Sequence, residues 1–196
     1  MSNLLIIFAR NPELGKTKTR LAKTLGDEMA LAIYYKLLSH IQRITKDLDC
    51  DKTVYYSGHV DTEDNWDNEI YKKKVQKGHD LGEKMHNAIN DGLQAGYKSV
   101  VLIGTDIYEL TSGIIASGFE KLKSNDVVIG PAKDGGYYLI GMKSPSKAIF
   151  QISKWSTPNV FNETVALIER EKFSWAKTAL LNDIDELEDL KGTDLY

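Results

Sequence analysis

A cluster of cations follows the first apolar segment of the chain, and these residue types can bind phosphate. The apolar segment covers residues 4–9, and the basic side chains come after it: Arg10, Lys16, Lys18 and Arg20. One acid, Glu13, lies among them. Lys offers a compact charge and Arg a planar fork of donors, which together suit a di- or triphosphate. A solvated turn is the alternative, but charge and position at the carboxyl end of a strand favour phosphate binding.

The loop differs from the two common glycine-rich phosphate cradles. Gly15, Lys16 and Thr17 match the end of a Walker A loop, but that pattern needs a glycine at the position of Arg10. Pro12 also removes a backbone donor. The chain contains no Gly-x-Gly-x-x-Gly dinucleotide motif. We therefore predict a loop in which side-chain charge, together with Gly15, binds the phosphates.

Carboxylates that follow predicted strands could hold a divalent metal. Asp106 comes after the apolar segment 99–103 and after Gly104, which allows backbone to approach a ligand. Asp185 follows the last predicted strand, together with Asp183. A phosphate ligand normally travels with Mg²⁺ or Mn²⁺, which takes oxygen ligands from one or two carboxylates. Each acid could instead cap a helix or form a turn. Their shared position after strands favours a metal site at Asp106 and Asp185.

Another acid, Asp134, lies in the glycine-rich loop 130–136 between two predicted strands. If the reaction is glycosyl transfer, Asp134 is the candidate general base for an acceptor hydroxyl. Gly135 and Gly136 beside it admit two interpretations, a tight turn or bare backbone that leaves room for a sugar or a base. We predict that these glycines and Gly104 contribute to the nucleotide site.

Apolar segments alternate with helical patterns, which predicts an α/β fold with a mainly parallel sheet. Strands are expected in seven places: 4–9, 52–57, 70–76, 99–103, 127–129, 137–141 and 177–181. Helices are expected in five: 18–47 with a break near Gly26, 81–96, 112–122, 159–170 and 186–190. The acidic segment 58–69 lacks periodicity and is predicted to be a loop.

Composition limits the class of protein further. A chain of 196 residues predicts a single domain spanning 1–196. The net charge of −3 argues against general nucleic-acid binding. One cysteine, Cys50, excludes an internal disulfide and a Cys-rich metal site. The first residues lack a basic leader and their apolar run is too short to span a bilayer, so we expect a cytoplasmic protein.

Several motifs, in order along nearly the whole chain, resemble those of one bacterial family. They are Phe8-Ala9-Arg10-Asn11-Pro12 through Gly15, Lys18-Thr19-Arg20-Leu21-Ala22, Asp80-Leu81-Gly82-Glu83-Lys84-Met85, Gly104-Thr105-Asp106, the segment 130–141 and Trp155-Ser156-Thr157. The family consists of GT-A-like proteins labelled as glycosyltransferases or as transferases associated with radical-SAM and selenodomain genes. It belongs to the nucleotide-diphospho-sugar transferase superfamily, which also contains nucleotidyltransferases.

The resemblance implies a GT-A fold, a three-layer α/β/α sandwich with a mainly parallel mixed sheet. It also implies that the N-terminal loop binds phosphates and that Asp106 binds a divalent metal. The segment 183–190 is similar to the final motif of sugar-activating cytidylyltransferases, in which the position matching Asp185 helps bind metal. One departure is that the family usually has Cys-Pro after the central aspartate, whereas this chain has Ile107-Tyr108. Loss of the proline frees a backbone φ and restores a donor.

These observations predict an enzyme, a metal-dependent transferase that uses a nucleotide sugar or a nucleoside triphosphate. It would transfer a glycosyl or nucleotidyl group to a small-molecule acceptor. Mg²⁺ or Mn²⁺ would bridge phosphate oxygens while Lys18 and Arg20 stabilise charge on the leaving group. The alternative is a module that binds a nucleotide or anionic metabolite without turnover. A phosphohydrolase would need a positioned water, for which the sequence shows no signature. The Tyr-rich segments leave room for a homodimer.

Overall fold

The computed structural model describes residues 2–196 and contains a seven-stranded mixed sheet. Four neighbouring strands run parallel, in the order β3 (Tyr71–Val75), β2 (Asp51–Tyr56), β1 (Asn3–Ala9) and β4 (Ser99–Ile103). Three more complete the sheet: β6 (Tyr137–Met142), β5 (Val127–Pro131) and β7 (Trp175–Lys177). β6 is antiparallel to both β4 and β5, whereas β7 is parallel to β5. The predicted mixed, mainly parallel sheet is therefore confirmed.

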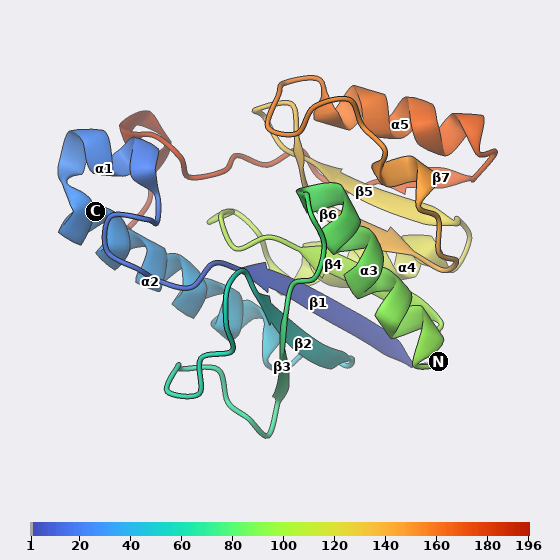
Figure 1. The fold of residues 1–196 in the computed structure, drawn as a ribbon, viewed down its shortest axis with the longest axis horizontal. Coiled ribbons are helices and arrows are strands. Elements are labelled where there is room, and N and C mark those ends of the chain that lie inside the picture. The colour runs from blue at the N-terminus through green and yellow to red at the C-terminus, as the bar shows by residue number, and fades with distance from the viewer. Residues whose placement is uncertain (1) are drawn as a thin grey trace.

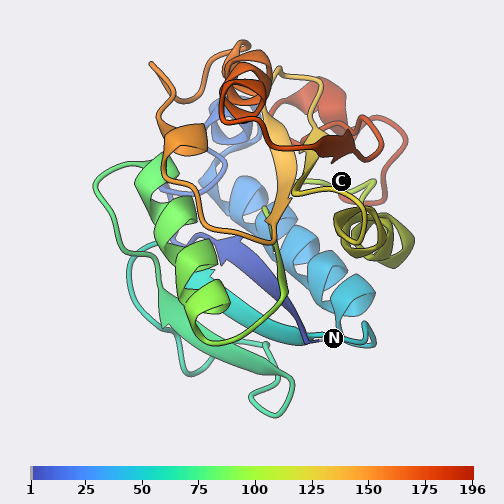
Figure 2. The same cartoon turned by 90° about the vertical axis from the view of Figure 1, so that its right-hand side faces the viewer.

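Helices cover both faces of the sheet, which gives the three layers that the resemblance implied (Figure 1, Figure 2). One face carries α2 (Asp27–Thr45) and α4 (Ser112–Leu122). The opposite face carries α3 (Leu81–Gln94) and α5 (Val160–Arg170). Three shorter helical segments complete the chain: α1 (Thr19–Leu25), η1 (Ala148–Phe150) and η2 (Leu187–Leu190).

The central strand β1 shows why its sequence is uniformly apolar. Leu5 and Ile7 are fully buried in the core that includes side chains of α2 and α4. Leu4 and Ile6 are buried in the second core, which includes side chains of α3 and α5. Successive side chains of a strand point to opposite faces, so a strand covered on both sides needs apolar residues at every position. This packing places the carboxyl end of β1 at the edge of the sheet, together with residues 10–20 after it, which we name the basic loop.

The expected break in the first long helix is confirmed at Gly26. This residue has φ 84°, which ends α1 and begins α2. A φ in this range is readily adopted only by glycine. The turn lets the short α1 leave the direction of the longer α2, and α1 lies beside the C-terminal segment in Figure 1.

The predicted position of the last strand is wrong. Strand β7 covers Trp175–Lys177, and of the predicted segment 177–181 only Leu181 forms a further, isolated bridge, to Ala132. The Tyr138 hydroxyl, on neighbouring β6, contacts Thr178 Oγ1 at 2.8 Å and donates to the Ala179 carbonyl at 2.9 Å. A side chain thus occupies a backbone acceptor that a continued strand would use. The acids Asp183 and Asp185 consequently lie on an irregular segment.

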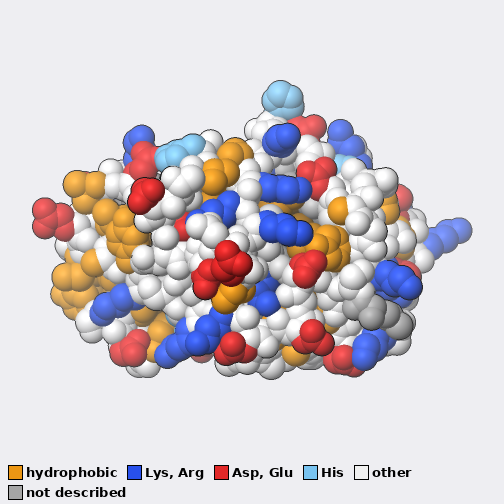
Figure 3. Space-filling model, turned by 90° about the horizontal axis from the view of Figure 1, so that it is seen from below, with side chains coloured by type: hydrophobic (Ala, Val, Ile, Leu, Met, Phe, Trp, Pro, Cys, Tyr) orange, Lys and Arg blue, Asp and Glu red, His pale blue; other side chains and the backbone are white. Residues whose placement is uncertain are grey.

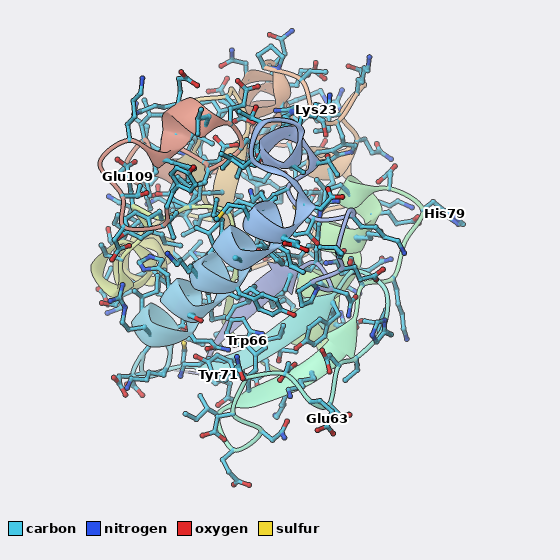
Figure 4. The ribbon with its side chains drawn as sticks, turned by 90° about the vertical axis from the view of Figure 1, so that its left-hand side faces the viewer. Lys23, Glu63, Trp66, Tyr71, His79 and Glu109 are labelled. Atoms are coloured by element: carbon cyan, nitrogen blue, oxygen red, sulfur yellow. The ribbon has the colours of Figure 1, made fainter. Side chains whose placement is uncertain are left out.

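The acidic segment 58–69 contains no helix or strand, as predicted. It is anchored by Trp66, whose ring packs edge-on against Tyr71 at 4.8 Å between centroids (Figure 4). Asp64 pairs with Lys73 at 2.6 Å, and both side chains are largely buried.

Seen from below, the molecule carries acidic and basic side chains interspersed over its surface (Figure 3). Within residues 2–196, none of the helices has the length and apolar character that a bilayer span requires.

Candidate functional site

Three cavities adjoin one another at the carboxyl ends of β1 and β4. The smallest, which we name the cationic cavity, has a volume of about 240 Å³ and is lined by Arg10, Lys16, Thr17, Lys18, Thr19, Arg20, Tyr34, Asp106, Ser156 and Asp185. The acidic cavity, of about 270 Å³, contains the carboxylates of Asp106, Asp134, Asp183 and Asp185. A larger cavity of about 520 Å³ extends along the sheet edge past Phe8, Ser57 and Gln76. Asp106 and Ser156 line all three.

The basic loop is held by its own backbone and hydroxyl groups. Thr17 is buried, and its hydroxyl donates to the Glu13 carbonyl at 3.1 Å and accepts from the Glu13 backbone N–H at 3.2 Å. The Lys16 backbone N–H also donates to the Glu13 carbonyl, at 3.1 Å. Gly15 forms the turn with φ 73°. It is not one of the described residues that line the cationic cavity. Its contribution is to the shape of the loop.

Asn11 ties this loop to the end of the neighbouring strand. It is buried, and its side-chain oxygen accepts from the backbone N–H groups of Gly58 and His59 at 2.9 and 3.3 Å. Its amide nitrogen donates to the His59 carbonyl at 2.9 Å. The Asn11 side chain thus pairs three backbone groups that follow the end of β2. Asn side chains often bond backbone groups in loops, but the sequence does not show which backbone groups Asn11 bonds.

Lys18 brings the basic loop and the predicted metal ligands together. Its ammonium lies 2.6 Å from Asp106 Oδ1 and 3.1 Å from Asp185 Oδ1, and its side chain is only 5% exposed. Burial alone would lower the pKa of Lys18, but the two carboxylates outweigh it and the pKa is raised. Lys18 is therefore charged. Arg20 Nη1 lies 3.3 Å from Asp185 Oδ2 on the exposed side of the same cluster.

The remaining predicted cations are more exposed. Lys16 lines the cationic cavity but pairs with Glu13 at 2.6 Å, and its side chain is 75% exposed. Arg10 lines both the cationic and the larger cavity. Both residues are exposed, whereas Lys18 is held between two carboxylates.

A backbone hydrogen bond explains how Asp185 reaches Asp106 from the far end of the chain. The Ile184 N–H donates to the Asp106 carbonyl at 2.9 Å, and the Ile184 side chain is buried. Asp189 accepts from the backbone N–H of Asp185 at 3.0 Å and so orients the segment. The irregular segment is thus fastened directly behind the turn that follows β4.

The residues that replace the family's Cys-Pro anchor the turn after Asp106. Ile107 is buried in the core beside α4. The Tyr108 hydroxyl donates to Asp194 Oδ1 at 2.6 Å, and its ring lies 5.3 Å from that of His40. Contacts from side chains therefore restrain a segment in which the missing proline would have restrained φ.

Tyr34 is a site residue that the sequence did not suggest. It is 1% exposed on α2, yet its hydroxyl accepts from the Arg10 N–H at 2.8 Å and contacts the Arg10 carbonyl at 3.1 Å. The same hydroxyl lies 3.3 Å from Thr105 Oγ1. Burial is the main reason why the pKa of Tyr34 is raised to about 12, so the hydroxyl stays protonated. Tyr34 links the ends of β1 and β4, but in the sequence it reads as one more residue of the buried helix stripe.

Ser156 belongs to the Trp155-Ser156-Thr157 motif, but the sequence analysis assigned it no role in the site. Its backbone adopts φ 62°, which is unusual for a residue other than glycine. Ser156 lines the cationic cavity together with residues of the basic loop. Backbone strain of this kind persists only where surrounding structure holds it, and it concentrates at functional sites.

The glycine-rich loop 130–136 contributes unequally to the site. Asp134 and Gly136 line the acidic cavity, and Asp134 Oδ1 accepts from the Gly136 N–H at 2.8 Å. Gly135 faces away, since a Cβ there would lie 2.1 Å from the Pro158 carbonyl oxygen. Gly135 therefore serves the turn and its packing. Gly104 lines the acidic and larger cavities, and a Cβ at its position would meet open space.

Asp183 is the most perturbed acid of the acidic cavity. Burial, followed by the carboxylates of Asp134 and Asp185, raises its pKa to about 6. Among residues 2–196, the lining of this cavity includes no Lys, Arg or His. Aromatic and apolar side chains complete the walls, among them Tyr137 and Trp155. The two cavities are thus opposite in charge and share Asp106 and Asp185 at their boundary.

The residues present fit a divalent cation. Asp106 and Asp185 direct one oxygen each to a single positive charge, the Lys18 ammonium. Two carboxylates are what Mg²⁺ commonly takes from a protein when substrate phosphates supply further ligands. In the part of the chain that the structure describes, no three His, Cys, Asp or Glu side chains form a closed metal cluster. For a metal at this position the protein would supply two carboxylates, and water or a substrate would supply the other ligands.

Comparison with known protein families places the chain in one of them. A family described as an uncharacterized protein conserved in bacteria (DUF2064) matches residues 40–157, more than half of the chain. The chain belongs to this family. No curated protein matches it. Together with the solved structure from Desulfovibrio desulfuricans G20 described next, this match confirms the resemblance that the motifs indicated.

Among solved structures, a "putative nucleotide-diphospho-sugar transferase" from Desulfovibrio desulfuricans G20 is 28% identical, with a TM-score of 0.89 over 100% of this chain and 93% of that one. The inositol-1-phosphate CTP transferase from T. maritima is 12% identical, with a TM-score of 0.60 over 97% and 92%. A Mycobacterium tuberculosis H37Rv protein in complex with manganese is 10% identical, with a TM-score of 0.53 over 97% of each chain. This chain therefore has the nucleotide-diphospho-sugar transferase fold.

Proposed function

We propose that this DUF2064 protein is a metal-dependent transferase that acts on a nucleotide sugar or nucleoside triphosphate and a small-molecule acceptor. One observation carries the proposal: Lys18 and Arg20 line the same cavity as Asp106 and Asp185. A pyrophosphate in that cavity would touch cations from the basic loop and the carboxylates together. The name of the Desulfovibrio relative, a nucleotide-diphospho-sugar transferase, supports the same class of reaction.

Asp106 and Asp185 are the residues that would hold Mg²⁺ or Mn²⁺. A divalent ion at this position supplies Lewis-acid stabilisation of charge on phosphate oxygens. The manganese found with one structural neighbour is consistent with this choice of metal. Both side chains are partly exposed, 48% for Asp106 and 35% for Asp185, which leaves them accessible to an ion that arrives with its substrate.

The other residues bind, orient and exchange protons. Arg10, Lys16 and Arg20 would bind the phosphates, and charge-assisted bonds of this kind strengthen as negative charge develops on the leaving group. Asp134 lies in the adjoining acidic cavity, where its Oδ1 is fixed by the Gly136 N–H. Its Oδ2 would accept the proton of an acceptor hydroxyl. Catalysis would then consist chiefly of positioning and electrostatic stabilisation.

The test combines calorimetry with product analysis. Nucleotides and nucleotide sugars are titrated into the protein with Mg²⁺ and with EDTA. Asp106→Asn is expected to abolish the metal-dependent part of the affinity, whereas Asp91→Asn, an exposed acid on α3, leaves it unchanged. Release of pyrophosphate identifies nucleotidyl transfer, and release of a nucleoside diphosphate identifies glycosyl transfer. Binding that ignores both EDTA and Asp106→Asn contradicts the proposal.

The second candidate is a module that binds an anionic metabolite without turnover. The observation that favours it is the Lys18 ion pair, because Lys18 already neutralises part of the charge of Asp106 and Asp185. Such a module would bind its ligand equally well in EDTA and would release no product from any donor. The same titrations therefore separate the two candidates.

A further inference from the structure

The two carboxylates proposed for the metal already share a cation that belongs to the chain. The Lys18 ammonium lies 2.6 Å from Asp106 Oδ1 and 3.1 Å from Asp185 Oδ1. Its side chain is 5% exposed, whereas the Lys16 side chain in the same cavity is 75% exposed and pairs with Glu13. Lys18 is thus the cation of the loop that is held inside the carboxylate cluster.

The backbone of Lys18 supports this reading. The residue adopts φ 51° and ψ 47°, the left-handed region, just before α1, and its side chain makes no capping hydrogen bond to the helix. A residue with a Cβ occupies that region only when other contacts compensate the strain. The ion pairs with Asp106 and Asp185 are contacts of that kind. A ligand that offered the Lys18 ammonium a different anion could therefore replace these ion pairs and let the strained backbone of Lys18 relax.

We propose that Lys18 and a divalent cation are alternative partners of Asp106 and Asp185. A divalent ion bound beside the ammonium would meet its positive charge at close range, where repulsion is strong. A phosphate-bearing ligand removes this conflict, because its oxygens offer the ammonium new acceptors. Metal and phosphate then bind together, and each strengthens the binding of the other by the same factor. The phosphate ligand in this scheme rests on the proposed function, whereas the competition between Lys18 and the metal does not.

The experiment measures Mn²⁺ alone, by the electron paramagnetic resonance signal of the free ion. Lys18→Gln keeps a hydrogen-bonding side chain but removes the charge, and it is expected to bind Mn²⁺ about tenfold more tightly than the wild type, equal to about 1.4 kcal/mol. Lys18→Arg keeps the charge and is expected to bind no more tightly than the wild type. Lys16→Gln is the matched control, since it removes an equal charge from the same cavity, and it should change the affinity less than about twofold.

A second titration adds inorganic pyrophosphate. Because pyrophosphate itself binds Mn²⁺, its complex with the ion is measured without protein and subtracted. Pyrophosphate should tighten Mn²⁺ binding in the wild type and tighten it much less in Lys18→Gln. Equal or weaker Mn²⁺ binding by Lys18→Gln overturns the inference, as does an increase of the same size in Lys16→Gln. Loss of the fold in Lys18→Gln and in a second variant, Lys18→Met, also overturns it if Mn²⁺ does not restore the fold, because a divalent ion that is an alternative partner would replace the lost charge.

The outcomes distinguish this inference from the proposed function. If Lys18→Gln binds Mn²⁺ more tightly but no donor is turned over, the competition stands and the transferase proposal falls. If donors are turned over with Mg²⁺ but Lys18→Gln binds Mn²⁺ no more tightly than the wild type, only the inference falls.

Discussion

Tyr34→Phe removes a single hydroxyl that links the two strand ends of the site. The hydroxyl contacts the Arg10 N–H at 2.8 Å, the Arg10 carbonyl at 3.1 Å and Thr105 Oγ1 at 3.3 Å, and the side chain is 1% exposed. Each such bond contributes about 1 kcal/mol, and a buried donor left without a partner costs more. Because the three contacts converge on one atom and are not additive, we expect a loss of about 2 kcal/mol in the free energy of unfolding.

The chain offers a matched control in Tyr71→Phe. The Tyr71 hydroxyl lies 2.8 Å from Thr45 Oγ1 and donates to the Gln42 carbonyl at 3.2 Å, and the side chain is 3% exposed. Its partners lie on α2, the helix that carries Tyr34, but Tyr71 itself is on β3, away from the basic loop (Figure 4). Urea unfolding should therefore report similar losses of stability for both variants. Calorimetry with Mg²⁺ and pyrophosphate should report weaker binding, by about tenfold, for Tyr34→Phe alone.

The comparison separates a positioning role from a merely structural one. Tyr34 fixes the backbone that carries Arg10 and the residue before Asp106, so its loss should shift the ligand contacts. If both variants lose affinity to the same extent, the effect follows global stability and the reasoning is refuted. Unchanged affinity in Tyr34→Phe, with the expected loss of stability, refutes it equally.

Three further predictions concern stability, measured by urea unfolding. Asp183 holds its proton more tightly in the folded protein, with a pKa of about 6 against 3.8 unfolded, so wild-type stability falls as pH rises between these values. Asp183→Asn should remove this fall and add about 1 kcal/mol at neutral pH, after allowance for solvent screening. Asp64→Asn leaves the buried Lys73 ammonium unpaired and should cost about 3 kcal/mol. Gly82→Ala places a Cβ 2.6 Å from the Trp155 ring and should cost about 2 kcal/mol. Unchanged unfolding curves would contradict each one.

The sequence predicted the encounter between the basic loop and Asp106 for a reason that the sheet makes plain. β1 and β4 are parallel neighbours, so the residues that follow them emerge at the same edge. The type and order of these side chains could be read directly, because both follow uninterrupted apolar segments. Their proximity then depends only on the rule that carboxyl ends of parallel strands share an edge.

Other parts of the site depend on contacts that no local pattern encodes. Asp185 reaches Asp106 through a backbone bond from Ile184, not through a strand, and the predicted strand before it was misplaced. Tyr34 belongs to a helix stripe whose period shows burial but not what its hydroxyl bonds. The left-handed conformation of Ser156 has no signature in its residue type. Each of these features is set by tertiary packing.

The opposite charges of the two adjoining cavities bear on the direction of transfer. The cationic cavity would hold the phosphates, and the acidic cavity, which begins at the same Asp106 and Asp185, would repel them. A donor could then enter in only one orientation, with its phosphates toward Lys18 and the transferred group toward Asp134. An acceptor in the acidic cavity would face that group and would be selected against negative charge. Lys18, on the boundary, would respond to both halves, because it leaves the carboxylates only when phosphate offers it a stronger partner.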